Sequence, residues 1–282
     1  MIALYLFLVF INPCLSQNQD FRCGFKDEDF LPNNKEEGGG GPLFEGAIET
    51  CCRNTTKWEN DIVVYYFDPD FPEIDKRIVK SQMKKIKENT CITFKELLDP
   101  DPNDTHLHRL KIRPSPKDYS NEIRYKWYNN KWVKYKPCNW GRVSTHRTKK
   151  EFALELNGDG TEECKPGLVM HELMHTLGML HTIKRPDRDD FVTVNDECIP
   201  NNRKGDYKKF NESTADLFNV PYKCKSIMHY PNYKSFRCDA VTAKNCPDGF
   251  GFHDYSSPLK EDWLLLKKEH CDDGGDVSPN GA

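Results

Sequence analysis

Residues 171–182 read HELMHTLGMLHT and place three histidines and one glutamate at fixed intervals. On a helix, His171 and His175 project from the same face about one turn apart, because they are separated by four residues. Imidazole nitrogens are ligands that Zn²⁺ takes in tetrahedral geometry. Glu172 lies beside such a metal without having to bind it, and there it can accept a proton from an activated water. The stretch therefore predicts a catalytic metal site.

Gly178 and His181 extend this pattern to HExxHxxGxxH. Glycine lets the backbone leave the helix, so that His181 can approach the same ion from outside it. Three protein ligands leave one coordination position for water, as a catalytic zinc site requires. A helix of core residues with solvated histidines would need neither Glu172 nor the Gly–His spacing. A structural zinc site is disfavoured because no fourth Cys or His stands nearby in sequence.

The helices and strands that must position these residues can be predicted from hydrophobic periodicity and from residues typical of helix ends. Pro166 suits the first turn of a helix and Gly178 suits its end, so we expect a helix over about 166–177. Another helix is expected at 73–90 and a last one at 259–271, from apolar residues at helical spacing. Strands are expected at 62–67, 91–94, 107–113, 124–128, 131–135 and 152–157.

The net charge and the composition of one predicted hairpin argue against nucleic acid and membranes as partners. The chain of 282 residues has 41 basic and 44 acidic residues and a formal net charge of −3, so no global field attracts nucleic acid or an anionic membrane. The segments RYKWY and KWVKY alternate basic and aromatic residues on either side of Asn129 and Asn130. A two-faced hairpin with one solvated basic face is favoured over a nucleic-acid platform. We expect a protein or peptide substrate, no nucleic-acid or membrane partner, and a monomer.

The start of the chain and its cysteines indicate export. The apolar run from Met1 to Ile11 is shorter than the roughly 20 residues that span a bilayer and suits a signal peptide cleaved near residue 16. A buried first strand of the mature protein is the alternative. Twelve cysteines predict disulfides in an oxidising compartment. Glycosylation sequons occur at Asn54, Asn103 and Asn211. The predicted location is secreted and extracellular.

The longer histidine pattern is the metzincin signature, and its surroundings resemble the astacin family of zinc proteases. After His181, TIKRPDRDDFV is similar to the RPDRD run of astacins, and SIMHY at 226–230 resembles their Met-turn. Upstream, LFEGAIE at 43–49 resembles the astacin pro-segment motif. CCRNTTKWENDIVVYYFDP is similar to the junction at which the mature enzyme starts, and TCITF to the start of the first disulfide strand. The resemblance runs from about Leu43 to Cys271.

The resemblance implies one zinc ion per chain, bound by His171, His175 and His181. It makes Glu172 the general base and acid, and Tyr230 a mobile fifth ligand whose phenol donates to developing negative charge. Met228 would pack beneath the site. The implied fold is an α+β, two-lobed, zincin-like metzincin domain with an active-site helix and a Met-turn. An extended substrate would pair with an edge strand of its sheet.

Four parts of the chain are expected. The apolar run predicts a signal peptide at 1–16, and polar composition predicts a disordered tail at 272–282. The resemblance implies a pro-segment at 17–53 and a catalytic domain at 54–271. Cleavage after Arg53 leaves eight of the cysteines in the mature chain. The two disulfides of the family correspond to Cys91–Cys271 and Cys138–Cys164. Two further bridges of open pairing are expected among Cys198, Cys224, Cys238 and Cys246. The cysteines that stay in the pro-segment are Cys23, Cys51 and Cys52.

Two positions depart from the astacin pattern. Astacins carry a zinc-binding Asp in the pro-segment motif, and Ala47 stands at that position here. A methyl group cannot ligate zinc, so latency either uses the nearby Glu49, Cys51 or Cys52, or is weak or absent. Astacins have Glu after the third histidine, where it pairs with the buried amino terminus. Thr182 cannot form that ion pair, so the terminus is anchored differently or left free.

Two functions of different class are compatible with these residues. The first is a secreted zinc endopeptidase of the astacin type, with Glu172 as general base. The second is a catalytically idle relative, a secreted binding or toxin-like protein that keeps the fold. Because the three histidines, Glu172 and Tyr230 are all present, the sequence favours the enzyme.

Overall fold

The computed structural model describes the chain from Trp58 to Cys271 with gaps, as residues 58–98, 100, 108–115, 124–128, 131–135, 138, 141–145, 151–158, 160, 164–210, 217–230, 238–247, 249–250 and 257–271. The predicted signal peptide, pro-segment and tail lie outside these ranges. So do Ala47, Glu49, the cysteines before Arg53, and the sequons at Asn54, Asn103 and Asn211.

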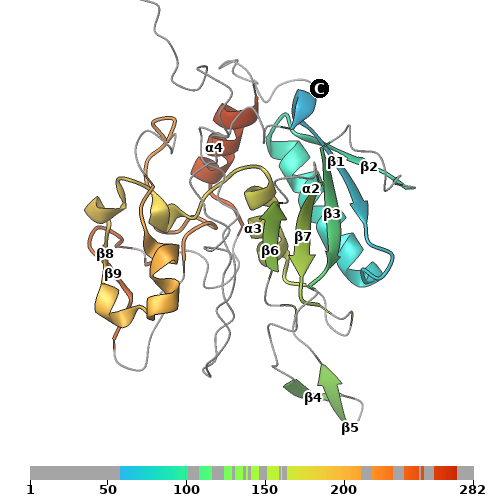
Figure 1. Ribbon diagram of the computed structural model, residues 1–282, viewed down its shortest axis with the longest axis horizontal. Coiled ribbons are helices and arrows are strands. Elements are labelled where there is room, and N and C mark those ends of the chain that lie inside the picture. Colours follow the sequence, from blue (N-terminus) through green and yellow to red (C-terminus); the bar gives the residue numbers. More distant parts are fainter. Residues whose placement is uncertain are drawn as a thin grey trace, which may run out of the picture. The chain divides into compact units, whose positions relative to one another are not determined.

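A five-stranded mixed sheet forms one part of the domain (Figure 1). Its strands, in spatial order, are β2 (Thr93–Glu96), β1 (Ile62–Phe67), β3 (Arg109–Pro114), β7 (Glu151–Leu156) and β6 (Gly141–Thr145). The first four run parallel, and β6 pairs antiparallel with β7 at the edge. Val63, Leu110, Ile112 and Leu154 are fully buried, as expected of central strands packed on a core.

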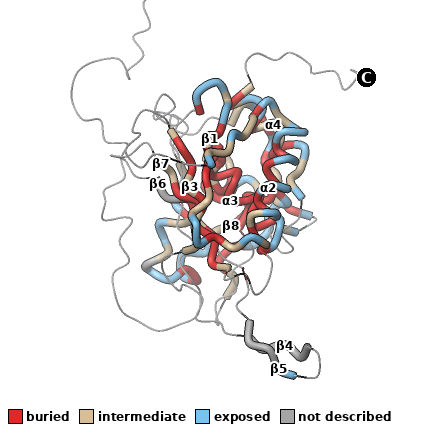
Figure 2. Tube along the Cα trace, turned by 90° about the vertical axis from the view of Figure 1, so that its right-hand side faces the viewer, coloured by how far each residue is buried: buried red, intermediate tan, exposed pale blue. Residues whose placement is uncertain are grey.

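Two helices cover the same face of this sheet. Helix α3 (Pro166–Thr176) packs against β6 and β7, and helix α2 (Glu73–Asn89) packs against β2 and against α3. On α2 the apolar residues Val79, Met83 and Ile86 are buried at helical spacing. All residues of α3 from Gly167 to Thr176 are buried, so this helix lies in the interior (Figure 2).

Irregular chain follows α3. Four short 3-10 segments succeed one another, at Thr182–Lys184, Arg188–Asp190, Asp196–Cys198 and Asn201–Tyr207. Strands β8 (Val192–Val194) and β9 (Val241–Ala243) form a separate antiparallel pair. Among the described residues these segments share a second hydrophobic cluster, which includes Ile183, Tyr207 and Tyr230. Helix α4 (Lys260–His270) closes the domain. Its Leu266 is buried in the first hydrophobic cluster, which also includes Val63 of β1 and Met83 of α2.

Most predicted elements are confirmed. The strand at 62–67 and the hairpin of β4 (Arg124–Tyr128) with β5 (Lys131–Tyr135) have the predicted bounds. The predicted helices agree within one residue at each end. The strand predicted at 91–94 is wrong by two residues, since Cys91 and Ile92 lead into a strand that begins at Thr93. Strand β6 was not predicted, because GRVST acquires its extended form by pairing with β7.

Four disulfides join described residues. Cys91–Cys271 and Cys138–Cys164 are the two pairs that the resemblance implies. The pairing left open by the sequence is Cys198–Cys238 and Cys224–Cys246, so both further bridges lie in the irregular part of the chain. Cys91–Cys271 joins the segment after α2 to the residue after α4.

The disulfides differ in the length of chain that they close. Cys91 and Cys271 are 180 residues apart, whereas Cys224 and Cys246 are 22 apart. Because a longer closed loop restricts the unfolded chain more, replacing Cys91 and Cys271 by Ser should lower the free energy of unfolding by about 5 kcal/mol. The same change at Cys224 and Cys246 should lower it by about 3 kcal/mol. Denaturant unfolding measures both, and equal losses would contradict the loop-length argument.

Candidate metal centre

The start of α3 is held from two sides. Pro166 occupies the first helical position after Lys165, as predicted. The preceding Cys164 is bonded to Cys138, and its N–H donates to Asp75 Oδ1 on α2 at 2.8 Å. The helix therefore enters the core at a defined place, and its register decides where the histidines lie.

The end of α3 turns through a glycine. Gly178 has φ of +90°, a conformation that residues with a Cβ rarely adopt. Its N–H donates to His175 O at 3.0 Å, and Met179 N–H donates to Met174 O at 3.1 Å. These two bonds are those of a Schellman motif. The added methyl of an alanine would meet nothing within 4 Å, so the backbone angle, and not space, requires glycine here. The turn directs the chain towards His181.

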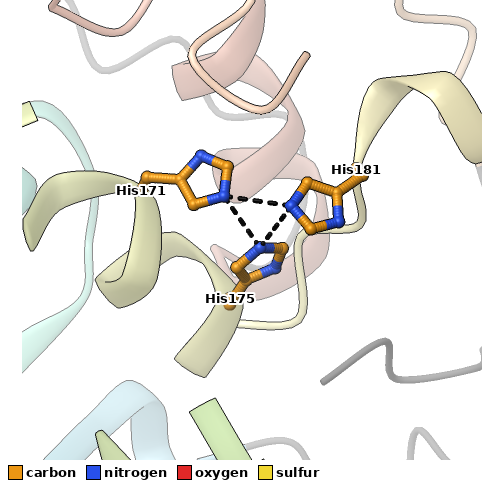
Figure 3. Close-up of side chains that lie close together, drawn as sticks. All are labelled: His171, His175 and His181. Atoms are coloured by element: carbon orange, nitrogen blue, oxygen red, sulfur yellow. Dashed lines mark hydrogen bonds between the residues drawn. The ribbon is translucent and has the colours of Figure 1, made fainter. Parts of the chain in front are cut away.

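The three predicted ligands converge. One nitrogen of each of His171, His175 and His181 points towards the other two rings (Figure 3). The distances between these Nε2 atoms are 3.0–3.1 Å. All three rings are buried, at 3% exposure each. Within the described part of the chain, these three histidines form the group of potential ligand side chains that could hold a metal ion.

Backbone carbonyls determine which nitrogen of two of the rings faces the centre. His171 Nδ1 lies 2.8 Å from Ile227 O, and His175 Nδ1 lies 2.7 Å from Met179 O. A carbonyl oxygen only accepts, so both Nδ1 atoms carry a proton and both Nε2 atoms present a lone pair. Burial and the neighbouring rings lower the pKa of all three imidazoles well below the usual range, which keeps them neutral. Neutral imidazoles with converging lone pairs are a cation site.

Glu172 lies on α3 beside this cluster and is 4% exposed. Burial raises the pKa of its carboxyl to about 8. A cation on the neighbouring imidazoles would favour the carboxylate instead. Gly141 on β6 leaves space for this side chain, because a Cβ there would lie 2.7 Å from Glu172 Cγ and 2.9 Å from Leu156 Cδ2.

The Met-turn residues contact the third histidine and the residue that follows it. The ring of Tyr230 is 4.3 Å from the ring of His181, between centroids, and burial raises the pKa of Tyr230 well above its usual value. Met228 is fully buried in the first hydrophobic cluster. Thr182, next to the third histidine, is buried, and its N–H donates to Met228 O at 3.0 Å.

Helix α4 supports this turn through Asp262. Ser226 Oγ donates to Asp262 Oδ1 at 2.6 Å, and the N–H groups of Ile227 and Leu259 donate to Oδ2 at 3.3 and 2.8 Å. Ile227 is the residue whose carbonyl orients His171. Sequence reasoning missed Asp262, Ile227, Met179 and Gly141. Only their places in the fold connect them to the ligands, although their neighbours in SIMHY and in the glycine turn were recognised.

Comparison with known proteins identifies the family. A family model described as Astacin, a peptidase family, matches residues 50–113 and 124–246. The chain belongs to the astacin family. The recognition by resemblance is thereby confirmed, and the α+β metzincin fold with it. As members of this family are zinc peptidases, the three histidines are candidate zinc ligands. Two nitrogens that each lie 2.0–2.1 Å from a tetrahedral Zn²⁺ are roughly 3.3 Å apart. The histidine spacing fits that ion.

Individual relatives are distant. Zinc metalloproteinase nas-11 of Caenorhabditis elegans is 26% identical over 239 residues, which cover 83% of this chain and 36% of that protein. The beta subunit of meprin A from Rattus norvegicus is 27% identical over 211 residues, covering 72% of this chain and 25% of that protein. This astacin-family chain therefore spans about a third and a quarter of the lengths of these two relatives.

A solved structure agrees in fold. High choriolytic enzyme 1, a hatching enzyme zinc-protease from Oryzias latipes (medaka fish), has a TM-score of 0.55 and 18% identity to this chain. The match covers 76% of this chain and 93% of that one. Among the described residues of this astacin-family member, no helix is both long and apolar enough to cross a bilayer.

The space around Gly141 gives a stability prediction. Gly141→Ala forces the buried Glu172 and Leu156 side chains to shift, so we expect it to lower the free energy of unfolding by about 1–3 kcal/mol. Gly205→Ala is the matched control, because its methyl meets no atom within 4 Å. That change should leave stability unchanged or raise it by up to about 1 kcal/mol. Denaturant unfolding of both variants decides, and equal effects would contradict the packing argument.

His229, between Met228 and Tyr230, gives a pH prediction. Its buried ring donates from Nδ1 to Tyr230 O at 2.7 Å and accepts at Nε2 from the Tyr222 hydroxyl at 2.8 Å, so it is neutral and fully hydrogen-bonded. Burial lowers its pKa to about 4. Since this lies below the unfolded value, the unfolded chain binds the extra proton. The contribution to stability is present above about pH 6.5 and is lost as the pH falls to about 4.

We expect the titration of His229 to lower the free energy of unfolding by roughly 3 kcal/mol as the pH falls from 7 to 4. His229→Asn keeps an amide N–H and does not titrate, so urea unfolding of the variant should show that much less loss across the interval. The other titrating groups are common to both proteins and cancel in the comparison. Parallel pH profiles for variant and wild type would show that His229 does not titrate in this way.

Proposed function

We propose that this chain is a secreted zinc endopeptidase that hydrolyses peptide bonds of proteins or peptides, with one zinc ion per chain. The observation that carries the proposal is the convergence of three buried Nε2 atoms on one point, with the tautomers of two rings determined by carbonyl oxygens. Membership of the astacin family supports the same reaction. A binding protein of the same fold would need neither this geometry nor the buried carboxyl beside it.

Each residue has a separate role in this proposal. His171, His175 and His181 would hold the zinc ion, which would supply Lewis acidity for activating a water molecule and polarising the scissile carbonyl. The Glu172 carboxylate takes a proton from the water as its oxygen attacks the carbonyl carbon. The same group then returns the proton to the departing amine as the C–N bond breaks. The Tyr230 phenol donates a hydrogen bond to the negative charge that develops on the carbonyl oxygen.

Several features support export and processing as parts of the proposal. Four disulfides within the described residues suit an oxidising compartment. We propose cleavage of the signal peptide near residue 16 and of the pro-segment after Arg53, with glycans at Asn54, Asn103 and Asn211. The catalytic domain then begins at residue 54 and ends near residue 271. We also propose that it acts as a monomer.

Replacement of Glu172 tests the reaction. Glu172→Ala keeps the three ligands and removes the base, so zinc content should stay at one per chain while kcat on casein or gelatin falls at least about 100-fold. His171→Ala should lose both the zinc and the activity. Elemental analysis and a protease assay on the processed protein measure these outcomes. Stoichiometric zinc without cleavage that depends on Glu172 would favour the catalytically idle, binding or toxin-like alternative.

A further inference from the structure

The last carbonyls of α3 are all hydrogen-bonded, although the final turn of a helix has no intrahelical donors for them. Met174 O and His175 O accept from the glycine turn, through Met179 N–H and Gly178 N–H. The next two carbonyls accept from side chains that are remote in sequence. Trp58 Nε1 donates to Thr176 O at 2.9 Å, and His270 Nε2 lies 2.8 Å from Leu177 O. Since a carbonyl only accepts, His270 Nε2 is the donor.

Both donor side chains are buried, at 2% exposure each. The Trp58 ring packs against Phe152 of β7, with 5.3 Å between the ring centroids. His270 is the last residue of α4, and the disulfide of the next residue, Cys271, ties that helix end to Cys91. The surroundings of each side chain therefore hold its N–H in place independently of the contact with α3. A donor that its surroundings already order loses little conformational entropy when it forms its hydrogen bond.

The two chain segments that carry these donors also lie close to each other. His270 Nδ1 lies 3.4 Å from Asp61 Oδ1, and Asp61 N–H donates to Trp58 O at 3.1 Å. Asp61 has φ of +55°, a left-handed angle, and its carboxylate lies beside the last residue of α4. The first described residues of the chain and the end of the last described helix thus lie next to each other at the end of α3.

This contact lies directly beside the candidate ligands. Thr176 and Leu177 stand between His175 and Gly178, so their carbonyls orient the backbone that carries one ligand and turns towards the other, His181. A shift of this turn moves Met179 O, which holds the His175 ring by Nδ1. Groups that hydrogen-bond the ligating side chains themselves change metal affinity by about 10–100-fold when they are removed. Because Trp58 and His270 act on the ligands through the backbone, we expect an effect at the lower end of that range.

We infer that Trp58 and His270 are positioning residues of the metal centre, which hold the carboxyl end of the active-site helix in the orientation that zinc binding needs. The inference rests on the proposed function in that the bound metal is zinc. It also gives the amino-terminal segment an anchor in place of the ion pair that Thr182 cannot form. The anchoring donor is an indole N–H, so this contact does not need the free amino group of a newly cut chain.

The experiment compares matched variants of the processed protein. Trp58→Phe removes the donor and keeps the ring, and His270→Ala removes the other donor. His270→Gln restores an N–H near the position of Nε2. Leu266→Ala is the control, because it removes buried packing from α4 without touching α3 carbonyls. The measurements are zinc affinity by competition with a chromogenic chelator, thermal unfolding, and kcat and KM on casein.

Trp58→Phe and His270→Ala should each weaken zinc affinity by roughly tenfold. His270→Gln should recover most of that loss, and Leu266→Ala should lower the unfolding temperature while zinc affinity stays within about twofold of wild type. Unchanged zinc affinity in Trp58→Phe and His270→Ala would overturn the inference. An equal loss in Leu266→Ala would also overturn it, because a general loss of stability would then explain the result.

Two further outcomes keep the inference separate from the proposed function. If the wild-type protein binds zinc but does not hydrolyse casein, the proposed reaction fails, while the affinities of the variants still decide the role of Trp58 and His270. If His270→Ala does not fold, the comparison of Trp58→Phe and His270→Gln with wild type decides. A Trp58→Phe protein with wild-type zinc affinity then contradicts the inference.

Discussion

Three imidazole nitrogens that face one another across 3.0–3.1 Å in the protein interior are the constraint on which the rest of the domain depends. In a medium of low dielectric constant, three converging lone pairs repel unless a cation lies between them. The rings therefore have to be held in place by something other than their mutual contact. Carbonyl oxygens of Ile227 and Met179 do this for two of the rings, and the glycine turn brings in the third.

Helix α4 stabilises both pieces of chain that carry this arrangement. At its beginning, Asp262 binds Ser226 and the N–H of Ile227, whose carbonyl orients His171. At its end, His270 binds the carbonyl of Leu177, the residue that directly follows α3. The Cys91–Cys271 disulfide attaches the same helix to the chain beyond α2. The geometry of the metal centre thus depends on residues that follow the ligands by about 80 to 100 positions in sequence.

The parts of the fold that were predictable are those with a local cause. Pro166 and Gly178 delimit a helix because of their own backbone chemistry, and the structure places both where that chemistry requires. The buried periodicity of α2 was visible for the same reason. Strand β6 was not, since its extended form comes from pairing with β7 across the sheet edge. The pairing of Cys198 with Cys238, and of Cys224 with Cys246, was open because spacing alone does not decide connectivity.

By itself, the sequence determined which side chains converge on the metal centre. The helix repeat places His171 and His175 on one face with Glu172 beside them, and a positive φ at Gly178 returns the chain to His181. Only the tertiary structure decided what holds those side chains there. Trp58 lies 118 residues from its acceptor, His270 lies 93 from its own, and Ile227 lies 56 from His171. A spacing rule describes neighbours along one element, whereas these partners are brought together by the packing of the sheet and helices, which no local pattern encodes.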